Sequence, residues 1–205
     1  MTNKYKEVYD LVYKNSDIYS DKMDEMSGRV RKDPVIFSVI NHFRPRKIVD
    51  IGCGQGYYVR KFINDFNIDA FGVEISSICC NKYLGDVPHE NMGALDFLIK
   101  QDISSYDFIF STDVLEHIER SDVEEILRLS SRISPVALFG LANHSDIIEG
   151  IELHIIQEDE NWWLDLLANY YDNVKLISTL YGGRFFFILC CNGHVDAFNN
   201  FSYQP

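Results

Sequence analysis

The feature that most constrains this chain is the segment VDIGCGQGY at residues 49–57, in which three glycines alternate with other residues. The apolar run at 47–52 predicts a buried strand before it, and the amphipathic pattern at 56–66 predicts a helix after it. Glycine permits a tight turn and lets a ligand approach bare backbone, and the first amides of the helix face that ligand. The unit therefore predicts a parallel α/β fold with a ligand at the carboxyl ends of its strands.

The same alternation of strand and helix patterns continues along the chain. Ser121 and Glu124 form a capping-box pattern that predicts a helix start, and Gly182-Gly183 predicts a hairpin whose last strand is antiparallel. The predicted strands are 68–74, 106–111, 135–140, 173–179 and 184–191, and the predicted helices are 77–84, 121–133 and 158–171. Strands separated by helices imply a doubly wound sheet with helices on both faces.

Residues 1–45 have a different character and are expected to form an N-terminal helical cap on one compact domain spanning 46–205. Apolar residues at helical spacing predict a helix near 5–13, and the polar stretch 15–31 predicts a loop or a short broken helix. Pro34 is expected to open a helix that ends at Pro45. The tyrosines of the first helix form either a packing face or a lid, and the lid residues would be Tyr13, Tyr19 and Met23.

Composition limits the classes of partner. The 205 residues carry a formal net charge of −12, which disfavours nucleic acid because phosphate backbones repel an acidic chain. The five cysteines form neither a disulfide framework nor a metal motif and are expected to be buried. Without an apolar leader or a long apolar run, the expectation is a cytoplasmic protein that does not enter membranes and whose oligomeric state is open.

The glycine spacing separates two classes of cofactor. A dinucleotide fingerprint would need glycine at position 57, where this chain has Tyr57. The segment resembles motif I of the class I S-adenosyl-L-methionine (SAM)-dependent methyltransferases. That resemblance implies SAM as the cofactor, with Asp50 near its methionine end and the turn Gly52, Cys53, Gly54 and Gly56 beneath it.

Two further motifs extend the resemblance over residues 47–191. Glu74 ends the next predicted strand, where a carboxylate can accept both ribose hydroxyls, with Ile75 beside it. The segment STDVLEHI at 111–118, including Thr112, resembles the family's segment after strand 4. The family's adenine position carries Ala94 and Leu95 here, so either their backbone or the nearby Asp96 would read the adenine. The implied sheet has seven strands in the order 3-2-1-4-5-7-6, with strand 7 antiparallel.

Methyl transfer needs an aligned acceptor and, for a hydroxyl, a base. The candidates are His154, His117 and Asp113, and histidine is the usual base near neutral pH. His154 is preferred because it lies just before the predicted helix that carries Trp162 and Trp163. The pattern Asp-x-x-Glu-His with a later histidine also resembles the divalent-metal site of some RNA-end and quinone methyltransferases. Mg²⁺ therefore stays open as a second cofactor, and no residue is assigned as its ligand.

The sequence thus predicts a SAM-dependent methyltransferase that acts on an oxygen or nitrogen of a small polar metabolite or glycan-type intermediate. An RNA or protein methyltransferase with a metal-assisted site, and an inactive SAM-binding scaffold subunit, are the alternatives. A small-molecule acceptor is the expected partner.

Overall fold

In the computed structural model of the protein, residues 3–15, 29–148, 150–193 and 196–204 are described. The strands are β1 (Lys47–Ile51), β2 (Asp69–Glu74), β3 (His89–Asn91), β4 (Phe108–Thr112), β5 (Val136–Ala142), β6 (Ile147–Ile148), β7 (Ile151–Glu152), β8 (Asn173–Leu180) and β9 (Phe185–Cys191). The α-helices are α1 (Asn3–Asn15), α2 (Arg29–Phe43), α3 (Tyr57–Phe66), α4 (Ser77–Cys79), α5 (Ala94–Leu98), α6 (Arg120–Ile133), α7 (Glu160–Leu167) and α8 (Asp196–Asn200).

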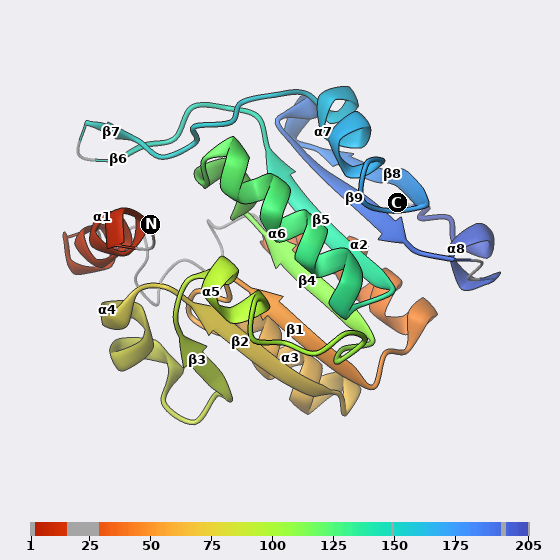
Figure 1. Ribbon diagram of the computed structural model, residues 1–205, viewed down its shortest axis with the longest axis horizontal. Helices are drawn as coiled ribbons and strands as arrows, with labels where there is room; N and C mark the ends of the chain where they lie inside the picture. The colour runs from red at the N-terminus through yellow and green to blue at the C-terminus, as the bar shows by residue number, and fades with distance from the viewer. Residues whose placement is uncertain (1–2, 16–28, 149, 194–195, 205) are drawn as a thin grey trace.

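Seven strands form one sheet in the order β3-β2-β1-β4-β5-β9-β8 (Figure 1). All neighbouring pairs are parallel except those of β9, which runs antiparallel to both β5 and β8. The predicted strand order and the single antiparallel strand are confirmed. A separate two-stranded sheet of β6 and β7, which the sequence pattern did not predict, projects beside α1 (Figure 1).

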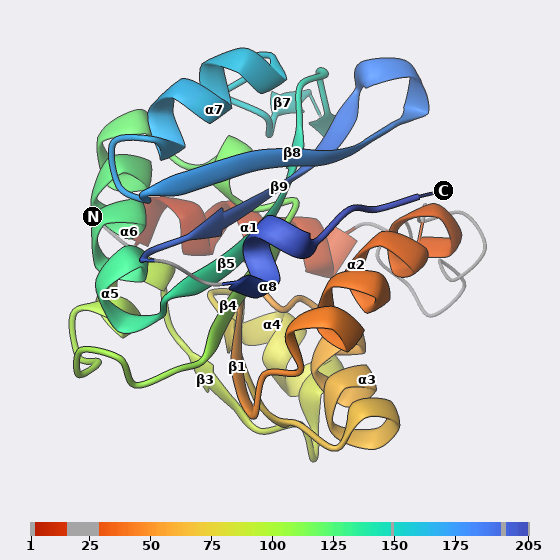
Figure 2. The same ribbon diagram turned by 90° about the vertical axis from the view of Figure 1, so that its right-hand side faces the viewer.

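Side-chain alternation along the strands builds a core on each face of the sheet. Ile48, Phe108 and Phe110 pack against α2 and α3 on one face. Val49 and Ile109 pack with α5, α6 and α7 on the other, and Figure 2 shows the two helical layers with the sheet between them. Because both faces are covered, the central strands are continuous apolar runs rather than alternating ones.

The structure corrects several local predictions. The predicted helix start at Ser121 is wrong. Helix α6 begins at Arg120 after the cap residue Glu119, so Ser121 lies inside the first turn. The helix expected to open at Pro34 begins at Arg29, with Pro34 in its interior. The helix expected to reach residue 171 ends at Leu167.

The expected burial of the cysteines is confirmed, and the two tryptophans differ in their surroundings. All five cysteines are free and buried. Of the two adjacent tryptophans, Trp163 is fully buried, whereas Trp162 lies under the guanidinium of Arg120 at 5.2 Å from its ring centroid. In the described part of the chain, no helix combines the length and the apolarity needed to cross a membrane.

Candidate active site

A cavity of about 900 Å³ opens at the carboxyl ends of β1, β2 and β4. Its lining comes from the β1–α3 turn, the ends of these strands, helix α1 and the loop that carries β6 and β7. Tyr5, Tyr9 and Tyr13 of α1 line it, while the other expected lid residues, Tyr19 and Met23, lie outside the described residues.

The glycine turn forms the floor of one half of the cavity. Gly52 has φ +75°, and a β-carbon there would lie 2.3 Å from Cγ2 of Val114, so no other residue fits without a shift. The amides of Gly52 and Cys53 both donate to the carbonyl of Val73. Gly56 does not reach the cavity: it begins α3 in the left-handed conformation and packs near Leu84. The turn leaves bare backbone facing the cavity, as the sequence predicted.

Two carboxylates stand beside this turn. One oxygen of Glu74 accepts from the amide of Gly54 at 2.9 Å and the other accepts from the amide of Ser76 at 2.8 Å. A carboxylate offers about four lone-pair sites, so each oxygen can accept one further hydroxyl. Burial raises the pKa of Glu74, and burial together with the charge of Glu74 raises the pKa of Asp50 well above its ordinary value. The pair forms a dehydrated recess lined by carboxyl oxygens and suited to hydroxyl and ammonium donors.

The remaining residues expected to bind the cofactor lie along the same half. Ile75, Ala94, Leu95 and Thr112 all line the cavity, and so does the exposed Asp96. The hydroxyl oxygen of Thr112 is buried without a hydrogen-bond partner among the described residues. The recess between β2 and α5 therefore combines apolar walls with polar groups at its edge.

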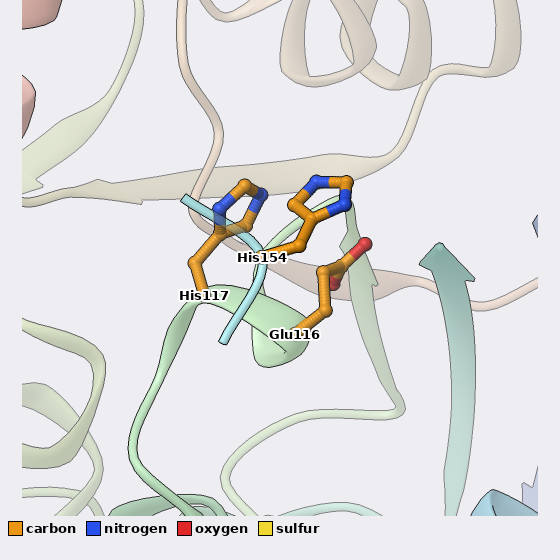
Figure 3. A group of neighbouring side chains, drawn as sticks. All are labelled: Glu116, His117 and His154. Carbon is orange, nitrogen blue, oxygen red and sulfur yellow. The ribbon is translucent and has the colours of Figure 1, made fainter. Parts of the chain in front are cut away.

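Two histidines, His117 and His154, line the other half of the cavity and cluster with Glu116, which is fully buried beside them (Figure 3). The Nδ1 atom of His117 lies 3.0 Å from the carbonyl of Leu153, and that of His154 lies 2.5 Å from the carbonyl of His144. A carbonyl only accepts, so each Nδ1 carries the proton and each Nε2 keeps its lone pair. The two rings meet edge to face, with centroids 4.4 Å apart.

Burial gives the cluster unusual acid–base properties. The pKa of Glu116 is raised to about 8, chiefly by burial and then by the charge of Asp113. One of its oxygens accepts from the amide of Ala142 at 2.8 Å, and the other has no partner among the described residues. The pKa of His117 is lowered to about 4 by burial and by His154. Burial thus favours the uncharged forms of both Glu116 and His117.

Asp113 stands at the edge of this cluster in the left-handed conformation, with φ +55°. Its carboxylate pairs with the ammonium of Lys32, which reaches the cavity from α2. Sequence reasoning missed Lys32, which directly follows the polar stretch 15–31 and belongs to no motif. It also assigned Gly56 to the cofactor, whereas Gly56 shapes the start of α3.

The donor atoms of Glu116, His117 and His154 lie within 4.8 Å of one another, close enough to consider a metal. Two imidazole nitrogens and one carboxylate suit transition ions, whereas Mg²⁺ prefers oxygen ligands in octahedral geometry. The cluster is therefore a poor fit for the Mg²⁺ that the sequence pattern left open, and no step is assigned to that ion.

Comparison with known proteins places the fold and the glycine turn in context. A family model described as a methyltransferase domain matches residues 21–179, and the chain belongs to this family. A SAM-dependent methyltransferase from Archaeoglobus fulgidus superposes with a TM-score of 0.68 at 15% identity, covering 92% of this chain and 100% of that one. A 1,6-didemethyltoxoflavin-N1-methyltransferase from Burkholderia thailandensis superposes with a TM-score of 0.67 at 12% identity, covering 95% and 91%.

A sequence relative is the tRNA U34 carboxymethyltransferase of Vibrio cholerae serotype O1, which is 27% identical over 119 residues. The match covers 55% of this chain and 36% of that protein, so the chain corresponds to little more than a third of its relative. The chain therefore carries a methyltransferase domain with a Rossmann-like fold.

Proposed function

We propose that this enzyme transfers the methyl group of SAM to a hydroxyl oxygen of a small polar acceptor, such as a hydroxylated metabolite or a glycan-type intermediate. The observation that carries the proposal is the pair of buried imidazoles beside the SAM recess, His117 and His154, each with its Nδ1 proton held by a backbone carbonyl. Hydroxyl acceptors require a proton acceptor at this position, because the oxygen loses its proton as the new bond forms.

SAM supplies an activated methyl group when bound, and Asp50, Glu74 and the glycine turn are the residues proposed to hold it. The remaining requirement is to align the acceptor and remove its proton. We assign proton removal to His154, which lines the cavity and whose Nε2 lies 4.0 Å from Oδ2 of Asp146. His117 is the weaker base because its pKa is lowered to about 4, and we assign it to acceptor binding.

Replacing His154 with glutamine tests this assignment. Glutamine can still donate to the carbonyl of His144 but cannot accept the proton, so turnover is expected to fall about 10²- to 10⁴-fold. The assay is formation of S-adenosylhomocysteine (SAH) with a panel of hydroxylated metabolites and sugars. His42→Gln, on the surface of α2, is the matched control. Unchanged turnover in His154→Gln, with SAH binding intact, would contradict the assignment.

RNA is a second candidate acceptor, favoured by the similarity to the tRNA U34 carboxymethyltransferases. The charge of the cavity opposes it: the described lining contains two cationic residues, Lys32 and Arg184, against six acidic ones. An acidic mouth repels phosphates, and RNA binding normally needs a basic surface. Methyl transfer to bulk tRNA that weakens steeply with added salt would favour RNA, whereas transfer to small acceptors alone would favour the first candidate.

A further inference from the structure

Lys32 is placed unusually for a lysine. Among the residues that the structure describes, it is the only lysine or arginine that is buried, with 8% of its surface exposed. Burying an ammonium is costly unless it is paired, and lysine is rarely fully buried without a partner. The position therefore calls for an explanation beyond solubility, which accounts for most surface lysines.

The surroundings of Lys32 compensate for part of this cost. Its ammonium pairs with the carboxylate of Asp113, and its Nζ lies 3.9 Å from the ring centroid of Phe185. An ammonium has three N–H donors. One serves Asp113 and the ring faces another side of the group, which leaves donor capacity toward the cavity that Lys32 lines.

The charge of Lys32 acts on the acceptor cluster. It lowers the pKa of Glu116, opposing the effect of Asp113 on the same carboxyl group. Of the two histidines beside Glu116, His117 is kept uncharged by burial, which lowers its pKa to about 4. Arg184 also lines the cavity, but Lys32 is the cation that acts on Glu116, and it occupies the carboxylate of Asp113 that would otherwise be free to bind a metal.

We propose that the Lys32 ammonium is the resident cation of the acceptor site and takes the place of a divalent metal ion there. It donates to the acceptor oxygen as negative charge develops on it, and it repels a divalent ion from Glu116, His117 and His154. This inference rests on the proposed function, because it names the group that holds the acceptor. It also assigns a role to a residue outside the motifs that define the family.

Binding of Mn²⁺ tests the inference without any knowledge of the acceptor. Mn²⁺ accepts mixed nitrogen and oxygen ligands, and its paramagnetic resonance signal reports the free ion. The wild-type protein is expected to bind Mn²⁺ no tighter than about 1 mM, whereas Lys32→Met should bind at least about tenfold tighter, because repulsion is removed and Asp113 is released. Lys32→Arg keeps the charge and should exclude the ion as the wild type does.

Two controls locate the effect. Lys61→Met removes the same charge from the exposed face of α3, where Lys61 pairs with Asp65, and should leave Mn²⁺ binding unchanged. Lys32→Met combined with His117→Ala should lose the tightened binding. Tight Mn²⁺ binding by the wild type, or no gain in Lys32→Met, would overturn the inference.

If Lys32→Met fails to fold, the wild-type titration and Lys32→Gln still decide the question. SAH binding in each variant reports an intact cofactor site. It also separates failure of this inference from failure of the proposed function. If the wild type does not bind SAH, the proposed methyltransferase function is wrong, whereas the Mn²⁺ titrations test only the role of Lys32.

Discussion

Replacing His117 with glutamine should make the protein less sensitive to acid. His117 is buried, and its pKa is lowered to about 4 from an ordinary value of 6.5. Between these values the unfolded chain takes up a proton that the folded protein does not. Stability therefore falls as pH decreases through this window, and it is unaffected by this group above about pH 7. Glutamine does not titrate, yet it can still donate to the carbonyl of Leu153.

The size of the effect follows from the shift. One pKa unit corresponds to about 1.4 kcal/mol, so a shift from 6.5 to about 4 is worth about 3 kcal/mol at low pH, of which about 2 kcal/mol develops between pH 7 and pH 5. Glu116 acts in the opposite direction. Its pKa of about 8 means that the folded protein holds a proton there, so its contribution to stability decreases as pH rises from 4.5 to 8.

The comparison of wild type with His117→Gln removes the contribution of Glu116, which both proteins share. Urea unfolding at pH 7 and pH 5, followed by the fluorescence of the buried Trp163, gives the free energy of unfolding. The wild type should lose about 2 kcal/mol more than the variant between the two pH values. Equal losses in the two proteins would refute the claim that His117 is held neutral by burial.

Two further predictions concern the SAM recess. Gly52→Ala should weaken SAH binding and lower the stability by about 1–2 kcal/mol, because φ at Gly52 is +75° and the new β-carbon meets Val114. Adding Val114→Ala should restore part of the loss. If it restores nothing, the predicted clash with Val114 is wrong. Asp10→Ala removes the acceptor of the Ser76 hydroxyl and the Ile78 amide, which join α1 to the start of α4. Asp10→Ala should lower the stability by about 1 kcal/mol through lost helix capping, and it should speed SAH dissociation in stopped-flow measurements. Asp10→Asn should have a smaller effect on both quantities. Equal dissociation rates in the wild type and Asp10→Ala would show that α1 does not retain the ligand.

The sheet was predictable from sequence because its signals are local. Apolar runs of strand length alternate with amphipathic helices, and the glycine turn at 52–56 fixes where the first crossover begins. The Gly182-Gly183 pair fixes the closing hairpin in the same way. Strand order then followed from the resemblance to the methyltransferase family, and β1 through β9 bear it out. The β6–β7 pair has only two residues in each strand, too few for a periodic pattern.

The cofactor motifs were also local, whereas the acceptor cluster depends on distant contacts. The pair of Lys32 and Asp113 joins residues 81 positions apart, and nothing in the polar run around Lys32 distinguishes it from a solvated lysine. The capping-box pattern failed for a related reason. The amides of Asp122 and Val123 donate to the carbonyl of Glu119, which places Ser121 within the helix, and a serine three residues before a glutamate does not by itself mark a helix start.

The most direct test of the account is calorimetric titration of the wild type and Glu74→Ala with SAH. The carboxylate of Glu74 is predicted to accept the ribose hydroxyls, and a hydrogen bond to a charged group contributes about 1.5–3 kcal/mol. The wild type should therefore bind SAH with micromolar affinity, and the variant should bind about 10- to 150-fold more weakly while remaining folded. A folded wild type that does not bind SAH, or a variant that binds it equally well, would contradict the assignment of this recess to the cofactor.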